Sequence, residues 1–124
     1  MKALIIDDSR TTRAIISRLL QSLGYETAEA GDGLAALTHL QQNALPDIAF
    51  VDWNMPVMDG LEFVREVRKN PAFDPMRIVM VTSENDMTTV AEALEAGANE
   101  YLMKPFTKES LKEKIALLEV QPPR

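Results

Sequence analysis

Short apolar segments alternate five times with longer amphipathic segments along the chain. The apolar segments begin near Lys2, Glu26, Asp47, Arg77 and Glu100. Each interval between two starts has room for a helix and two short loops, which is the length that a crossover between parallel strands requires. The pattern therefore predicts strands and helices that alternate around a parallel sheet.

The amphipathic segments repeat with the 3.6-residue period of an α-helix. Gly24 and Gly97 are expected to end the first and fourth helices, because glycine tolerates the backbone conformation that follows a helix. Asp32 and Thr107 are expected to cap the second and fifth helices at their starts. The predicted apolar stripes are Thr12, Ile15, Ile16, Leu19, Leu20 and Leu23; Leu34, Leu37 and Leu40; Leu61, Val64 and Val67; Met87, Val90, Ala91 and Leu94; and Leu111, Ile115 and Leu118.

The predicted strands differ in a way that orders them. Leu4–Ile6, Ile48–Val51 and Ile78–Val81 are continuously apolar, as expected for strands covered by helices on both faces. Glu26–Ala30 alternates polar and apolar residues, and Glu100–Met103 begins with a polar residue, so these two suit the edges. With right-handed crossovers, the prediction is an α/β flavodoxin-like, doubly wound, parallel five-stranded sheet of order 2-1-3-4-5 with five helices.

Composition narrows the class of protein. The 124 residues include no cysteine, which excludes disulfides and thiolate metal sites. A chain of this length predicts one domain over 1–119, with a tail or the start of a linker at 120–124. The net charge of −6, with no basic cluster, argues against direct nucleic-acid binding. No apolar run is long enough for a membrane helix or a signal peptide. We therefore expect a soluble, cytoplasmic domain.

Chemically reactive side chains gather where the predicted strands end. Asp7 and Asp8 follow the first strand, Asp52 ends the third, Thr82 ends the fourth and Lys104 follows the fifth. Parallel strands place all of these residues at one edge of the sheet, and the three aspartates fall where the strand order reverses.

Three clustered carboxylates need compensation. At about 4 Å and an effective dielectric constant near 20, two like charges repel by roughly 4 kcal/mol. Either one carboxyl stays protonated or a cation lies between them, and Mg²⁺ suits an all-oxygen set of ligands. A carboxylate beside Mg²⁺ can attack phosphorus. Asp52 is the best candidate, because it ends a central strand and precedes a loop, Trp53–Asp59, that can offer a backbone carbonyl to the metal.

Four motifs carry these residues and resemble a known family. They are Ile5-Ile6-Asp7-Asp8-Ser9, Val51-Asp52-Trp53-Asn54-Met55-Pro56-x-Met58-Asp59-Gly60, Val81-Thr82-Ser83-Glu84 and Tyr101-Leu102-Met103-Lys104-Pro105-Phe106. In this order and at these spacings they resemble the receiver domains of bacterial two-component response regulators, especially the stand-alone chemotaxis type. The resemblance extends from Lys2 to about Glu119.

The resemblance implies a role for each residue at the sheet edge. Asp52 is implied to be the phosphoacceptor, and Lys104 to contact the phosphoryl group. Mg²⁺ is implied to be held by Asp7, Asp8, Asp52 and the backbone carbonyl of Asn54.

The resemblance also implies residues that act after phosphorylation. Thr82 is implied to be the switch hydroxyl and Tyr101 the switch aromatic. Asn54 and Glu84 are implied to tune how fast the phosphoryl group is lost, and the Lys104–Pro105 peptide bond is implied to be cis. The implied partners are a sensor histidine kinase or phosphotransfer protein, and a downstream protein that binds the face made by the fourth helix, fifth strand and fifth helix. Such a domain catalyses only its own phosphorylation and dephosphorylation.

Three other functions are weighed beside this one. The chain can be a receiver module cut from a larger regulator with an output domain. A Mg²⁺-dependent aspartyl-phosphate phosphatase or phosphotransferase is disfavoured. The motif after the first strand of such enzymes resembles Asp-x-Asp, whereas this chain has Asp7-Asp8-Ser9 there. A flavin or nucleotide site is disfavoured because Asp7–Thr12 is acidic and lacks glycine.

Overall fold

The computed structural model describes residues 1–83 and 87–119. Within these ranges, five strands form one parallel sheet: β1 (Lys2–Ile6), β2 (Glu26–Ala30), β3 (Ile48–Asp52), β4 (Arg77–Thr82) and β5 (Glu100–Met103). The strand order is β2-β1-β3-β4-β5, which confirms the predicted flavodoxin-like arrangement. The predicted tail, Val120–Arg124, and the predicted rate-tuning residue Glu84 lie outside the described residues.

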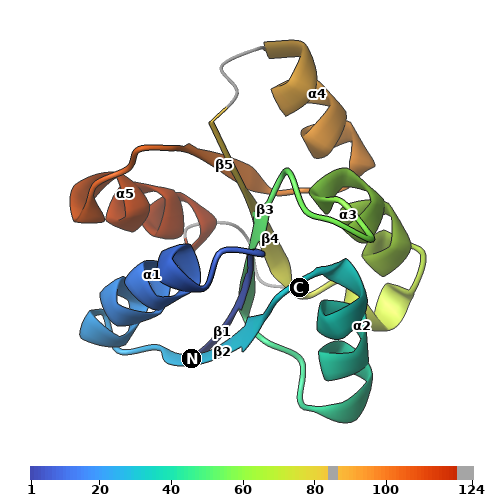
Figure 1. Ribbon diagram of the computed structural model, residues 1–124, viewed down its shortest axis with the longest axis horizontal. Coiled ribbons are helices and arrows are strands. Elements are labelled where there is room, and N and C mark those ends of the chain that lie inside the picture. Colours follow the sequence, from blue (N-terminus) through green and yellow to red (C-terminus); the bar gives the residue numbers. More distant parts are fainter. Residues whose placement is uncertain (84–86, 120–124) are drawn as a thin grey trace.

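Helices connect the strands and cover both faces of the sheet. They are α1 (Arg10–Ser22), α2 (Gly33–Gln42), α3 (Gly60–Arg68), α4 (Met87–Ala96) and α5 (Lys108–Glu119). A short 3₁₀ helix, η1 (Pro71–Phe73), precedes β4 and was not predicted from the pattern. Helices α1 and α5 lie on one side of the sheet, and α2, α3 and α4 lie on the other (Figure 1).

Strand side chains alternate between the two faces of the sheet and so build two cores. The core under α2, α3 and α4 contains Leu4, Ile6, Ala36, Leu40, Ala49, Val51, Phe63, Val64, Val67, Ile78 and Met80. The core under α1 and α5 contains Ile5, Ile16, Leu20, Phe50, Val79, Val81, Leu111, Ile115 and Leu118. Each large apolar side chain that is fully buried contributes about 1.5–3 kcal/mol, so the two cores hold the sheet edge that carries the site.

Helix ends follow local sequence signals. The Asp32 carboxylate accepts a hydrogen bond from the N–H of Ala35, and the Thr107 hydroxyl accepts one from the N–H of Ser110 (3.1 Å), as predicted for the two caps. Gly24 ends α1 at φ +95°. Asp59 begins α3 with a capping box, a cap that the sequence pattern did not identify.

Three of the predicted helix stripes, those of α1, α2 and α4, are wrong in part. Leu34, Ile15 and Leu94 are half or nearly half exposed, and Ala91 is exposed. In α2 the buried positions are instead Gly33, Ala36 and Leu40, and in α4 they include Val90 and Ala93. Small residues at these inward positions let the helices approach the sheet closely, and Leu34 and Leu94 turn outward. The predicted stripe of α5 is confirmed, because Leu111, Ile115 and Leu118 are all buried.

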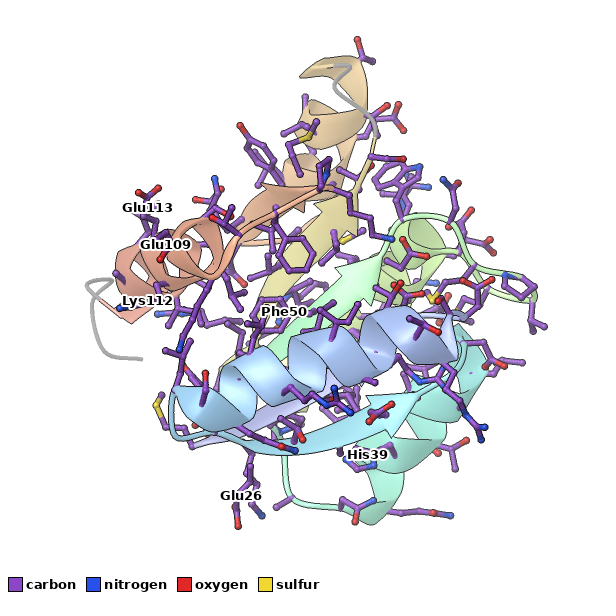
Figure 2. The ribbon with its side chains drawn as sticks, turned by 60° about the vertical axis from the view of Figure 1, so that its left-hand side comes forward. Glu26, His39, Phe50, Glu109, Lys112 and Glu113 are labelled. Atoms are coloured by element: carbon purple, nitrogen blue, oxygen red, sulfur yellow. The ribbon has the colours of Figure 1, made fainter. Side chains whose placement is uncertain are left out.

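The outer surface of α5 is charged. Figure 2 shows Glu109, Lys112 and Glu113 projecting from this helix away from the sheet, whereas Phe50 of β3 points into the interior. Among the described helices, none is both long enough and apolar enough to cross a bilayer.

A half-buried arginine ties together the amino ends of β4 and β5. Arg68, the last residue of α3, donates from Nε to the carbonyl of Gly97 (3.0 Å), from Nη1 to that of Phe73 (3.0 Å) and from Nη2 to that of Met76 (2.7 Å). Its Nη2 also donates to Oδ1 of Asn99 (3.1 Å). We call Arg68 and these four acceptor residues the arginine corner. No sequence signal pointed to it.

Candidate functional site

The carboxyl ends of three strands bring four of the predicted site residues together. Asp7 and Asp8 follow β1, Asp52 ends β3 and Lys104 follows β5. We call these four residues the acid pocket. One carboxylate oxygen from each aspartate lies within 4.8 Å of the others, between β1 and β3 where the strand order reverses. The sheet thus joins residues that are far apart in the sequence.

The acid pocket combines buried and accessible charge. Asp7 is 2% exposed and Asp52 is 7% exposed, whereas Asp8 is exposed. The Nζ of Lys104 lies 3.2 Å from Oδ1 of Asp52 and 3.6 Å from Oδ2 of Asp7. One ammonium therefore serves two buried carboxylates and leaves the cluster with an excess of negative charge.

The burial and the excess of negative charge affect the pKa of the central carboxyl, Asp52. Burial raises the pKa of Asp52 above its ordinary value of 3.8, and the charge of Asp7 raises that pKa further. Lys104 opposes both effects through its charge and its hydrogen bond, and Asp8 adds a smaller increase. A cation placed among the carboxylates would reverse the balance by favouring the ionised form.

Asp7 is arranged as a ligand with one oxygen to spare. Its Oδ1 accepts a hydrogen bond from the N–H of Ser9 (2.8 Å). Its Oδ2 is buried and accepts no hydrogen bond from the described residues. A buried oxygen of this kind costs free energy unless a ligand satisfies it. Together with the all-oxygen donor set, it makes the pocket suitable for Mg²⁺, which prefers carboxylates, carbonyls and water.

The loop after β3 forms the rim of the pocket. Asp8 and Asn54 line the same open depression, together with Met55, Pro56 and Asp59. The loop closes tightly, because the N–H of Gly60 donates to the carbonyl of Trp53 (3.0 Å) and a Cβ on Gly60 would collide with the backbone oxygen of Asp52. The glycine therefore lets α3 begin directly against the end of β3.

The predicted switch residues lie on β4, which pairs with the strand of Asp52, and on β5, the next strand of the sheet. Thr82 is 2% exposed at the end of β4, and its carbonyl accepts a hydrogen bond from the N–H of Lys104 (2.8 Å). Tyr101 of β5 is half-buried, and Nζ of Lys114 lies over its ring, 4.2 Å from the centroid. Lys114 also lies 3.1 Å from the carboxylate of Glu100. The Lys104–Pro105 peptide bond is cis.

Sequence reasoning missed one residue that contacts the acid pocket and one that contacts the predicted switch residue Tyr101. Arg13 of α1 donates from Nη1 to the carbonyl of Asp7 (2.5 Å), and Lys114 of α5 covers Tyr101. On the helical pattern both appear as ordinary polar positions. Only the packing of α1 and α5 against the sheet identifies their partners.

Comparisons with known proteins agree with this geometry. Residues 3–116 match the response regulator receiver domain family. The chain is 44% identical over 119 residues to the chemotaxis protein CheY1 of Helicobacter pylori, covering 95% of this chain and 96% of that protein. It is 46% identical over 116 residues to the chemotaxis protein CheY of Pseudomonas aeruginosa, covering 93% of each. The solved structure of the chemotaxis protein CheY4 of Vibrio cholerae matches with a TM-score of 0.87 at 38% identity, covering 94% of this chain and 96% of that one.

Proposed function

The chain belongs to the response regulator receiver domain family, and we propose that it accepts a phosphoryl group on Asp52 from a phosphohistidine of a sensor histidine kinase or phosphotransfer protein. Receiver domains of the CheY type are signalling proteins. The observation that carries the proposal is the position of Asp52. It is a buried carboxylate at the end of a central strand, 3.2 Å from a lysine ammonium and clustered with two further carboxylates.

The transfer is a displacement at phosphorus. A carboxylate oxygen of Asp52 forms the new P–O bond while the P–N bond to the donor imidazole breaks, and the imidazole leaves with the electron pair and takes up a proton. Lys104 neutralises charge on the phosphoryl oxygens, because its ammonium already lies beside Oδ1 of Asp52. The products are an aspartyl phosphate and a neutral histidine.

A magnesium ion completes the proposed site. Asp7, Asp8, Asp52 and the backbone carbonyl of Asn54 would hold it, and the spare buried oxygen of Asp7 supports this assignment. When bound, Mg²⁺ supplies the positive charge that lets a dianionic phosphoryl group enter an acidic pocket.

Phosphorylation is proposed to change a protein-binding surface. The Thr82 hydroxyl moves toward the new phosphoryl group, and the Tyr101 ring turns into the space that this movement opens behind it. Both residues lie next to the face made by α4, β5 and α5, where a downstream protein would bind. Preference for the phosphorylated form is limited to the difference in affinity between the two states.

We propose that the protein is cytoplasmic and that it catalyses only its own phosphorylation and dephosphorylation. Asn54 and Glu84 are proposed to set how fast the aspartyl phosphate is hydrolysed, and Asn54 lies on the rim of the acid pocket.

The first prediction tests Asp52 directly. Incubation with Mg²⁺ and a small acyl phosphate should add one phosphoryl group, measured by intact mass, and should change the fluorescence of the neighbouring Trp53. Asp52→Asn should abolish both signals, because an amide oxygen is a poor nucleophile. Asp74→Asn, which removes an exposed carboxylate outside the acid pocket, is the matched control and should label like the unsubstituted protein. Equal labelling of Asp52→Asn and Asp74→Asn would contradict the assignment.

A further inference from the structure

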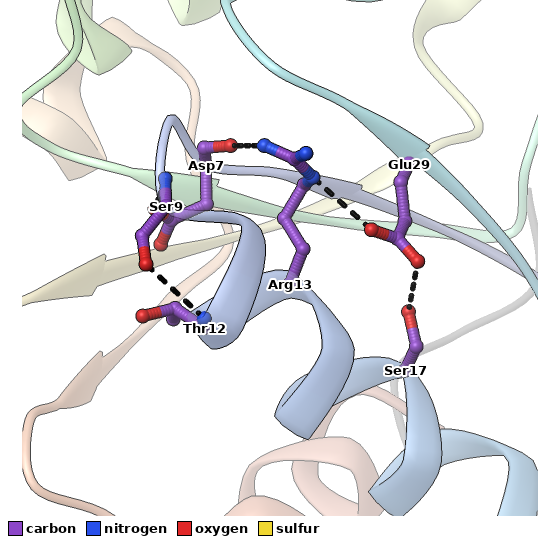
Figure 3. A network of polar contacts seen from close by, with 6 residues as sticks. All are labelled: Asp7, Ser9, Thr12, Arg13, Ser17 and Glu29. Carbon is purple, nitrogen blue, oxygen red and sulfur yellow. Dashed lines mark hydrogen bonds and ion pairs between the residues drawn. The ribbon is translucent and has the colours of Figure 1, made fainter.

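Arg13 joins α1 to the turn that carries the first two aspartates (Figure 3). Its side chain is only 16% exposed. Nη1 donates to the backbone carbonyl of Asp7 (2.5 Å), and Nε donates to Oε1 of Glu29 on β2 (3.0 Å). Glu29 is held in turn by the hydroxyl of Ser17 (3.3 Å). The guanidinium therefore spans from the edge strand to the acid pocket.

Among the described residues, every polar group of Asp7 except one makes a hydrogen bond. Its N–H donates to the carbonyl of Ala30 (3.1 Å), and its carbonyl accepts from Arg13. Its Oδ1 accepts from the N–H of Ser9, whose hydroxyl caps α1 by accepting from the N–H of Thr12. Oδ2 accepts no hydrogen bond from the described residues, and its nearest charged neighbour is the Lys104 ammonium at 3.6 Å. The backbone is thus clamped so that one carboxylate oxygen remains available inside the pocket.

We propose that Arg13 is a positioning residue for the magnesium site, and that Glu29 orients it. Arg13 fixes the backbone of Asp7 and thereby the direction of Oδ2, without touching the metal itself. This inference rests on the proposed magnesium site. A planar guanidinium suits the task because it can donate to a carbonyl and a carboxylate at once, whereas an ammonium is a single point charge.

The charge of Arg13 by itself would have the opposite effect. A cation near the pocket repels Mg²⁺, so removing it would tighten metal binding if charge were all that mattered. Glu29 lies 3.0 Å from Arg13 and makes the pair neutral overall. Geometry should therefore outweigh charge, and the direction of the change in Mg²⁺ affinity distinguishes the two effects.

The test is a Mg²⁺ titration followed by Trp53 emission, at a temperature where each protein is fully folded. Arg13→Met should weaken Mg²⁺ binding about tenfold, the lower end of the range for partners that orient metal ligands. Arg13→Lys keeps the charge and should also weaken binding, because one ammonium cannot serve both acceptors. Arg18→Met removes an exposed arginine from the same helix and should leave the affinity unchanged.

A second measurement separates positioning from general stability. In the metal-free protein, the amide resonance of Ser9 should shift in Arg13→Met and stay in place in Arg18→Met, because that amide donates to Oδ1 of Asp7. Unchanged or tighter Mg²⁺ binding in Arg13→Met would overturn the proposal. If Arg13→Met does not fold, Arg13→Lys decides: weaker binding supports the clamp, and equal binding overturns it. A lack of any Mg²⁺ response in the unsubstituted protein would overturn the magnesium site as well.

Discussion

The acid pocket and the arginine corner both bury charge at an end of the sheet, but they satisfy it differently. At the amino ends of β4 and β5, Arg68 has four close acceptors in the chain. At the carboxyl ends of β1 and β3, two buried aspartates share the ammonium of Lys104, and one of their carboxylate oxygens accepts no hydrogen bond from any described residue. The guanidinium of the corner is hydrogen-bonded within the chain, whereas Oδ2 of Asp7 in the pocket has only the more distant Lys104 ammonium, at 3.6 Å, among the described residues.

The same contrast appears in the effect of burial. Burial lowers the pKa of Arg68 and raises the pKa of Asp52, so in both places it disfavours the charged form. At the corner, hydrogen bonds to backbone carbonyls compensate for the desolvation of the guanidinium. In the pocket, the charge of Asp7 adds to the desolvation of Asp52. The difference separates a buried charge that is hydrogen-bonded within the chain from buried carboxylates that raise one another's cost of ionisation, as a proposed cation site would require.

The arginine corner and the loop beside the acid pocket also differ in which residue type adopts a positive φ. The corner places glycine where φ is positive, at Gly97 with φ +121°. The loop beside the pocket instead places Val57 at φ +71°, in a tight turn where the N–H of Met58 donates to the carbonyl of Pro56 (2.8 Å). A β-branched residue is strained in this region, and Val57 is 72% exposed, so no packing compensates for the strain.

The largest effect on the free energy of unfolding is expected from a substitution that disrupts the arginine corner. Arg68→Met should lower the free energy of unfolding by about 3 kcal/mol, because it leaves several part-buried acceptors without a donor. Mg²⁺ affinity should be unchanged, since the corner lies at the opposite ends of the strands. Urea denaturation and a Mg²⁺ titration measure the two quantities. Arg65→Met, an exposed arginine in the same helix, is the control and should change stability by less than about 0.5 kcal/mol. A loss of Mg²⁺ affinity in Arg68→Met would mean that the two ends are coupled.

A smaller effect, of opposite sign, should come from the loop beside the pocket. Val57→Gly should raise the free energy of unfolding by about 0.5–1 kcal/mol, because relief of the positive φ exceeds the added freedom of the unfolded chain. Val57→Ala keeps a Cβ at the same φ and should gain less. Urea denaturation of the metal-free proteins measures both. Destabilisation by Val57→Gly would show that the exposed side chain makes a stabilising contact.

The smallest effect is expected on the pH dependence of the stability of the metal-free protein, because Lys104 offsets part of the rise in the pKa of Asp52. Because the native pKa of Asp52 is raised, the native state keeps this proton to a higher pH than the unfolded chain. The stability that this group contributes is present below its ordinary value of 3.8 and is lost as pH rises through the native pKa. Asp52→Asn should therefore become more stable relative to the unsubstituted protein as pH rises above 3.8 and through the raised native pKa. Urea midpoints of both proteins with a chelator test this, and a constant difference would contradict it.

Much of the fold was readable in the sequence because its signals are local. Continuous apolar runs marked the central strands, and the polar starts of Glu26–Ala30 and Glu100–Met103 marked the edges that the structure confirms. Asp32, Thr107 and Gly24 bounded their helices as predicted, because a cap depends on residues within one turn. The gathering of Asp7, Asp8, Asp52 and Lys104 also followed, since parallel strands bring their carboxyl ends to one edge.

Helix faces and long-range polar partners required the tertiary structure. Leu34 and Leu94 fit a helical period but lie outward, because the space between neighbouring helices and the sheet, and not periodicity alone, selects the buried face. Arg13, Arg18, Arg65 and Arg68 look alike on a helix, and only packing separates the two that reach backbone carbonyls from the two that face solvent. The sequence by itself determined which elements form and which ends of the strands meet. The tertiary structure decided which charged groups find hydrogen-bond partners inside the chain, because partners distant in sequence are chosen by three-dimensional distance.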